Sequence, residues 1–201
     1  MKISSYTGGM VQTNGYLVET PDGNFLIDAP EGITDWILAK GVRVDEVLLT
    51  HQHYDHVSDA AKLQSLGAKI RAYTDYSPEL TLETVGSNWG IPIVVHKYGV
   101  DERIDVEAPI VSCGQPIRLA HVPGHSVDSI IFYIENENVV FVGDTLMAGG
   151  HGRTDLPGGS EQQLISGIRE HLLTLPPETR VLSGHGPATT IGQEASTNPF
   201  L

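Results

Sequence analysis

Thr50-His51-Gln52-His53-Tyr54-Asp55-His56 is the stretch of this 201-residue chain that decides its fold. Three imidazoles and one carboxylate lie within six residues, directly after the apolar run Val47-Leu48-Leu49, which favours a strand. With the chain's own frequencies of His and Asp, chance would produce the pattern His-x-His-x-Asp-His in about one sequence of this length in a thousand. The alternative is a solvated loop with a helix cap at Asp55, but the density of imidazoles favours metal binding.

The spacing within this stretch indicates two metal ions. In an extended loop alternate residues point to the same side, so His51 and His53 can share one ion. Asp55 and His56 then turn toward another side of the loop, where a second ion can bind.

Further ligands are expected, because one loop cannot fill the coordination shell of two transition-metal ions. A His or an Asp beside small residues follows three other predicted strands: His125 in His121-Val122-Pro123-Gly124-His125, Asp144 in Gly143-Asp144-Thr145, and His185 in Gly184-His185-Gly186. Taken alone, each is more often a cap or a surface group. Their recurrence at strand ends favours one shared metal site.

Composition restricts the partners. The chain has 12 Lys and Arg against 25 Asp and Glu, a formal net charge of -13, which argues against nucleic acid or an anionic membrane as partner. Cys113 is the single cysteine, so a disulfide framework and a cysteine-rich zinc site are excluded. No apolar run approaches the roughly 20 residues of a membrane span, and residues 1–6 lead into no secretory signal, so we expect a cytoplasmic protein.

One domain is expected over residues 1–201, because no linker, repeat or low-complexity tract divides the chain. A hairpin is predicted over 14–28, around the turn Pro21-Asp22-Gly23-Asn24. Helices are predicted at 34–40, 57–66 and 160–175, the last opened by the cap Ser160-Glu161-Gln162-Gln163, and further strands at 69–73, 117–122, 130–134, 139–142 and 180–182. Residues 75–115 show weak periodicity and carry no assignment.

In these motifs and their order the chain resembles the metallo-β-lactamase superfamily over residues 13–187. The resemblance implies an α/β fold, a four-layer αββα sandwich. It also implies one metal site of His51, His53 and His125 and a second of Asp55, His56 and His185, with Asp144 bridging both. The chain is most similar to short glyoxalase II-type (hydroxyacylglutathione hydrolase-like) proteins, because Gly143-Asp144-Thr145-Leu146 is followed by Gly-Arg-Thr-Asp-Leu-Pro-Gly-Gly at 152–159.

The expected activity is hydrolysis of an acyl thioester. Two divalent metal ions, zinc or else iron or manganese, make a bridging hydroxide available near neutral pH and polarise the substrate carbonyl. A thioester suits this site, because its thiolate leaves without a strong general acid. Asp55 is then both a ligand and an orienter of the hydroxide, while Asp144 bridges the metals.

Three other residue assignments accompany this expectation. Arg153 is predicted to hold the carboxylate of an anionic small-molecule substrate; its alternative is a surface pair with Asp155. Asp28 is either a partner of a ligand imidazole or a simple turn residue. The remaining histidines are expected not to bind metal: His96, His121, His151 and His171.

Other functions stay open at this point. The first is the persulfide dioxygenase branch, with a single iron on His51, His125 and Asp144; the Gly-His-Gly-Pro setting of His185 argues for the binuclear hydrolases instead. The absence of a signal peptide disfavours a β-lactamase, and the acidic charge disfavours a tRNA-processing nuclease. A structural metal module is disfavoured because seven ligands with room for water differ from a closed tetrahedral site. Nothing in the sequence sets the oligomeric state.

Overall fold

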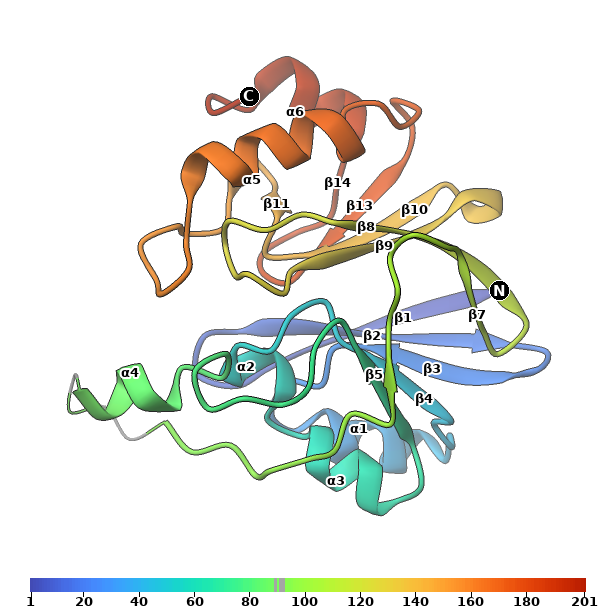
Figure 1. Ribbon diagram of the computed structural model, residues 1–201. Helices are drawn as coiled ribbons and strands as arrows, with labels where there is room; N and C mark the ends of the chain where they lie inside the picture. Colours follow the sequence, from blue (N-terminus) through green and yellow to red (C-terminus); the bar gives the residue numbers. More distant parts are fainter. Residues whose placement is uncertain (89, 91–92) are drawn as a thin grey trace. The chain divides into compact units, whose positions relative to one another are not determined.

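The computed structural model describes residues 1–88, 90 and 93–201 (Figure 1). Over these residues the chain divides into two compact units. The first comprises Met1–Ile104 and Val111–Gln115, and the second comprises Asp105–Ile110 and Pro116–Leu201. The expected single domain over 1–201 stays a prediction.

The first unit contains a mixed sheet. Its strands follow the chain order β1-β2-β3-β4-β5-β6, with bounds β1 (Lys2–Gly8), β2 (Thr13–Thr20), β3 (Gly23–Ile27), β4 (Glu46–Leu48), β5 (Lys69–Ala72) and β6 (Glu102–Arg103). β1, β2 and β3 pair antiparallel, and β3 to β6 pair parallel. The predicted hairpin is confirmed, because β2 pairs with β3 in the register Tyr16↔Ile27 to Thr20↔Gly23.

The helices of this unit are α1 (Ile33–Lys40), α2 (Tyr54–Val57), α3 (Ala60–Ser65) and α4 (Glu83–Asn88). Figure 1 shows α1 and α3 on one face of the sheet, where Ile33, Ile37 and Leu63 join the apolar core. The predicted helix at 34–40 is confirmed; it ends at Gly41, whose left-handed backbone lets its N–H reach two helical carbonyls.

The helix predicted at 57–66 is confirmed over α3, but its first residues are not part of that helix, because a turn at residues 58–59 separates α3 from α2. The cause is Asp59, whose N–H bonds the carbonyl of Ala29 and whose carboxylate accepts the N–H of Thr34. These two bonds hold Asp59 to the start of α1. Of the unassigned stretch 75–115, Trp89, Ile91 and Pro92 lie outside the described residues.

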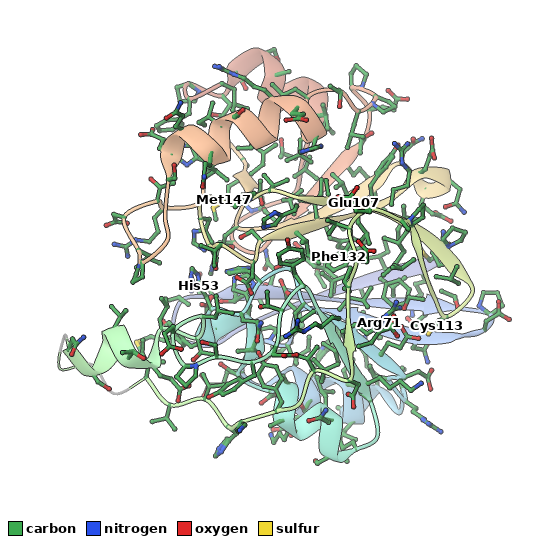
Figure 2. The ribbon with its side chains drawn as sticks, in the orientation of Figure 1. His53, Arg71, Glu107, Cys113, Phe132 and Met147 are labelled. Carbon is green, nitrogen blue, oxygen red and sulfur yellow. The ribbon has the colours of Figure 1, made fainter. Side chains whose placement is uncertain are left out.

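The other sheet has the order β14-β13-β10-β9-β8-β7. Its strands are β7 (Ile110–Ser112), β8 (Gln115–His121), β9 (Ile130–Ile134), β10 (Val139–Gly143), β13 (Arg180–Ser183) and β14 (Thr189–Thr190). β10 and β13 pair parallel, whereas β8, β9 and β10 pair antiparallel. The four strands predicted here are confirmed. Phe132 of β9, labelled in Figure 2, is fully buried.

The second unit also contains the short hairpin β11 (Leu146–Met147) and β12 (Gly150–His151), and the helices α5 (Glu161–Gly167) and α6 (Ile191–Thr197). A 3-10 turn, η1 (Glu135–Glu137), joins β9 to β10. The predicted cap of α5 is confirmed, because Ser160 Oγ accepts the N–H of Gln163. The helix continues as a π-helical segment, η2 (Ile168–Leu172), instead of running as one α-helix to 175.

One face of this helical segment is apolar and packs on the sheet. Leu164, Ile168 and Leu172 are fully buried and pack in one cluster with Val140 and Val181 of the sheet. The α/β class is thus present in both units. Within the described ranges, none of the helices has the length and apolar character needed to cross a membrane.

Candidate metal centre

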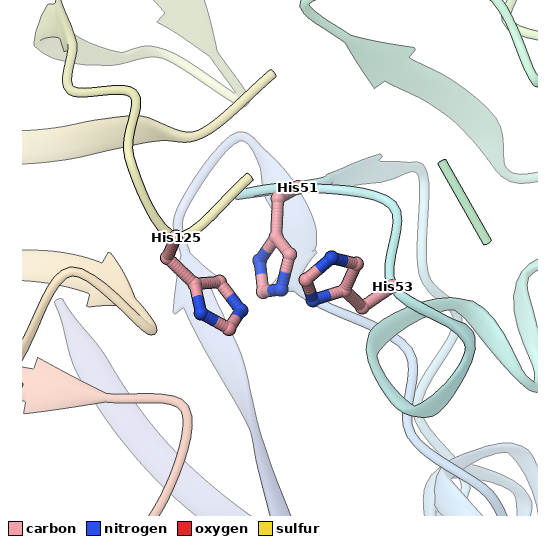
Figure 3. A group of neighbouring side chains, drawn as sticks. All are labelled: His51, His53 and His125. Carbon is pink, nitrogen blue, oxygen red and sulfur yellow. The ribbon is translucent and has the colours of Figure 1, made fainter. Parts of the chain in front are cut away.

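The histidine-rich stretch runs in the first unit from the connection after β4, which holds His51 and His53, into α2, which holds Asp55 and His56. Its three imidazoles are buried, and they pack against each other: the ring centroid of His51 lies 4.6 Å from that of His53 and 4.1 Å from that of His56. Figure 3 shows the rings of His51 and His53 side by side. The expectation that these residues gather after one strand is met in the structure.

Asp28 sets the orientation of His56. The carboxylate follows β3, is 2% exposed, and its Oδ2 lies 2.8 Å from His56 Nδ1. A carboxylate only accepts hydrogen bonds, so the imidazole proton sits on Nδ1 and Nε2 presents a lone pair. That Nε2 lies 3.4 Å from Asp55 Oδ2. Such a carboxylate behind an imidazole is typical of metal-binding histidines.

The same carboxylate acts on His51 through Thr50. Thr50 Oγ1 donates to Asp28 Oδ2 at 2.8 Å, so it can accept the proton of His51 Nδ1 at 3.1 Å. The backbone N–H of Thr50 donates to Asp28 Oδ1. Asp28 thereby contacts one imidazole directly and another through a hydroxyl. Its backbone, at φ 61°, is left-handed, as suits a turn. The contact with an imidazole is thus present, whereas the role of that imidazole as a metal ligand stays a prediction.

The carboxylate of Asp55 is held by a threonine of β2. Thr13 Oγ1, in β2, donates to Asp55 Oδ2 at 2.5 Å. The Asp55 side chain is 12% exposed and lies in the first turn of α2. Beside it, burial and the Asp55 charge raise the pKa of Tyr54 above its usual range, so this phenol stays neutral near pH 7.

In the second unit, two imidazoles meet one carboxylate. Asp144 directly follows β10, His185 follows β13, and His125 follows β8 and the turn after it. His125 Nε2 lies 3.5 Å and His185 Nε2 3.3 Å from the same oxygen, Asp144 Oδ2. Both imidazoles thus face one oxygen of Asp144, whose role as a bridging carboxylate stays a prediction.

The protonation of His125 provides a test of whether these residues fit a cation. His125 Nδ1 lies 2.8 Å from the carbonyl oxygen of Arg153, which can only accept, so Nδ1 carries the proton. Nε2 then turns its lone pair toward the negatively charged Asp144. Two electron-rich atoms facing each other repel unless positive charge lies between them. His and Asp donors are also those preferred by zinc, iron and manganese, so the donor set fits a divalent metal.

Two glycines permit this packing in the second unit. At Gly124, φ is 129°, and a Cβ would lie 2.5 Å from both Leu164 N and Ser160 O at the start of α5. The N–H of Ser160 donates to the carbonyl of Gly124 at 2.8 Å. At Gly152, a Cβ would overlap the carbonyl oxygen of Asp144 and lie 2.9 Å from His125 Nδ1. Neither position has room for a side chain.

Arg153 and Asp155 form an exposed ion pair. Arg153 Nε donates to Asp155 Oδ1 at 2.6 Å, and Nη2 donates to Oδ2 at 2.7 Å. These hydrogen bonds hold the pKa of Asp155 down to about 2 and raise that of Arg153. The pairing given as the alternative for Arg153 is therefore present. Its contact with a substrate carboxylate stays a prediction.

Two residues of the site region were not expected from the sequence. Thr50 immediately precedes His51, so its position beside the histidine-rich stretch could have indicated that it contacts these imidazoles. Thr13 lies 42 residues before Asp55 in the chain, and nothing local to β2 indicates that the two would meet.

Comparison with known proteins identifies the family. The family model of the metallo-beta-lactamase superfamily matches residues 8–185, which include residues of both units. The hydroxyacylglutathione hydrolase GloC of Haemophilus influenzae is 35% identical over 198 residues, which cover 94% of this chain and 93% of that protein.

Solved structures give the same result. The BLEG-1 B3 metallo-beta-lactamase has a TM-score of 0.90 at 32% identity and covers 100% of this chain and 99% of its own. TTHA1623, in a di-iron-bound form, has a TM-score of 0.85 at 37% identity and covers 98% of this chain and 100% of its own. The predicted α/β fold class is confirmed, and the chain belongs to the metallo-β-lactamase superfamily.

Proposed function

We propose that the chain is a binuclear metal-dependent hydrolase that cleaves an acyl thioester. The proposal joins the residues of the two units into one centre. His51, His53 and His125 would hold one ion, and Asp55, His56 and His185 the other, with Asp144 between them. Bound there, two divalent ions would supply a water of lowered pKa and polarise the thioester carbonyl.

The observation that carries this proposal is the position of Asp144. The imidazoles of His125 and His185, one from each proposed ligand set, face the same carboxylate oxygen at 3.5 and 3.3 Å. A carboxylate shared in this way offsets the repulsion between two neighbouring cations. The single-iron alternative uses His125 and Asp144 but assigns no role to His185 at this oxygen.

The chain's own residues would orient the reaction. Thr13 fixes Asp55, which can accept the proton of the attacking water and hold that water on line with the carbonyl carbon. Asp28 and Thr50 hold the rings of His56 and His51 in one tautomer, so that their Nε2 atoms remain ligands. The thiolate leaves without a strong acid, which suits a site made of imidazoles and carboxylates.

The substrate is proposed to be a small anionic thioester. GloC of H. influenzae, at 35% identity, is a hydroxyacylglutathione hydrolase, which favours a hydroxyacyl thioester. TTHA1623 holds two iron ions in its di-iron-bound form, which supports iron beside zinc as the metal here. The cytoplasmic location stays a prediction.

Metal analysis of the purified protein, combined with hydrolysis of S-lactoylglutathione, tests the proposal. We expect two ions per chain and turnover that chelation abolishes and zinc or iron restores. His185→Ala should lose one ion, whereas His96→Ala, which alters a histidine outside the proposed ligand sets, should retain both.

A different result would favour the single-iron alternative. One tightly bound ion that survives replacement of Asp55, His56 and His185, together with dependence on His51, His125 and Asp144, would overturn the binuclear proposal. Two bound ions without thioester hydrolysis would retain the metal centre and refute the substrate.

A further inference from the structure

From the geometry we infer that Glu194 and Asn198, in and just after the C-terminal helix α6, are positioning residues for His125. The inference rests on the proposed function in one respect, because it takes His125 to be a metal ligand. It concerns contacts within the second unit.

Glu194 is a buried carboxylate that joins three segments. It is 2% exposed, and its Oε2 accepts the backbone N–H of Gly149 at 2.9 Å and Asn198 Nδ2 at 2.9 Å. Its Oε1 accepts Thr189 Oγ1 at 2.6 Å. A buried carboxylate is costly unless its oxygens are hydrogen-bonded, so these three donors must keep their places around it.

Asn198 completes the attachment. Its Nδ2 donates to the carbonyl of Gly150 at 3.0 Å, and the residue is 7% exposed. The N–H of Gly149 and the C=O of Gly150 are thus both bonded to the C-terminal segment. These two glycines lie at the turn of the β11–β12 hairpin, where Met147 pairs with Gly150. The hairpin turn is therefore fixed to α6 by side chains.

The chain that leaves this hairpin leads directly to His125. Two residues after Gly150 comes Gly152, which packs so closely on Asp144 and His125 that no side chain fits. The next carbonyl, that of Arg153, accepts His125 Nδ1 at 2.8 Å. This carbonyl keeps the proton of His125 on Nδ1, and the lone pair of Nε2 toward Asp144.

The position of the Arg153 carbonyl thus depends on how the hairpin is held. The Arg153 guanidinium pairs with exposed Asp155 in the same loop, so this pair does not attach the loop to α6. Without Glu194 and Asn198 the turn at Gly149 and Gly150 loses these bonds to the C-terminal segment, and glycine allows many backbone conformations. The C-terminal segment would therefore act on the metal through the Arg153 carbonyl and His125.

Cobalt(II) provides the readout, because its visible spectrum reports the ligands and geometry of the bound ion. We expect Glu194→Ala and Asn198→Ala each to weaken cobalt affinity by about 10-fold, the lower end of the effect of removing a partner of a ligand. Their cobalt spectra should change in the same direction as that of His125→Ala. Glu194→Gln should restore both, since its amide can still accept from Gly149 and Asn198.

Two controls separate positioning from loss of stability. Gln193→Ala alters an exposed side chain on the same helix and should leave cobalt binding unchanged. Leu172→Ala removes a buried side chain from the core of the same unit and should lower the Tm without altering the cobalt spectrum.

The outcomes separate failure of the proposed ligand set from failure of the positioning role of Glu194 and Asn198. If His125→Ala binds cobalt with wild-type affinity and spectrum, the proposed ligand set fails. If His125→Ala alters the cobalt site but Glu194→Ala and Asn198→Ala behave like Leu172→Ala, the positioning inference is wrong while the proposed function stands.

Discussion

Replacing Asp28 by Asn separates its role in orienting imidazoles from its role in the backbone. Asn tolerates the left-handed backbone that Asp28 adopts at φ 61°, so the turn itself should persist. The Oδ1 atom can still accept the N–H of Thr50, but an NH₂ group replaces the oxygen that accepts Thr50 Oγ1 and His56 Nδ1. The proton of His56 must then move to Nε2, the atom proposed to bind metal.

The magnitude follows from the hydrogen bonds that change. Two bonds to a buried carboxylate, at about 1.5–3 kcal/mol each, give way to two neutral bonds of about 0.5–1.5 kcal/mol each. We therefore expect the free energy of unfolding of the metal-free protein to fall by about 2–3 kcal/mol. Metal affinity should fall by about 10–100-fold, because His56 loses the carboxylate that fixes its tautomer.

Urea unfolding of the metal-free protein measures the first effect, and competition with a chromophoric zinc chelator measures the second. Asp45→Asn is the matched control, since Asp45 Oδ2 also accepts a backbone N–H, that of Asn24, next to the start of β3. It should lower stability modestly and leave zinc affinity unchanged. Zinc affinity in Asp28→Asn equal to that in Asp45→Asn would show that Asp28 is merely a turn residue.

Three further predictions concern the second unit. Asp144→Asn should lower kcat by several orders of magnitude while far-UV circular dichroism stays native, because a neutral amide cannot bridge two cations; near-normal turnover would mean that the bridge is misassigned. Arg153→Ala should raise KM for an anionic thioester about 10-fold and leave a neutral thioester unaffected, measured by steady-state kinetics; equal losses on both would show that Arg153 shapes its loop through Asp155. Arg153 lowers the pKa of Asp155 to about 2, so the pair stabilises the folded protein fully above the unfolded pKa of about 3.9. This contribution is lost as the pH falls through 2. An NMR titration that gave the Asp155 carboxyl a pKa near 4 would contradict this.

Local patterns predicted the fold where local interactions determine it. The hairpin at 14–28 and the capped start of α5 depend on turn and cap residues a few positions apart, and both are confirmed. The helix predicted at 57–66 starts only at Ala60, because Asp59 bonds to Ala29 and Thr34, partners some 25–30 residues away. Such long-range contacts leave no periodic trace in the sequence.

In the candidate site, too, short-range patterns could be predicted and long-range contacts could not. The spacing of His51 to His56 marked the imidazoles, and the two-residue spacing of Arg153 and Asp155 made their ion pair foreseeable. The partners that orient the site were harder to identify. Thr13 and Glu194 lie on segments with no motif, and their contacts arise from how β2 and α6 pack. A carboxylate in a short terminal helix looks like a solvated surface charge until the helix is placed.

The tight contact between Gly124 and the start of α5 limits how this enzyme could acquire new substrates. Loops commonly tolerate insertions, and specificity can change when they lengthen. An insertion next to Gly124, however, would have to displace Ser160 and Leu164, and with them the first turn of α5. Changes that alter the substrate range are therefore expected in loops that do not pack against the start of a helix. The turn between β1 and β2, where Met10 is 91% exposed, is one place where insertions and substitutions could accumulate without cost to the core.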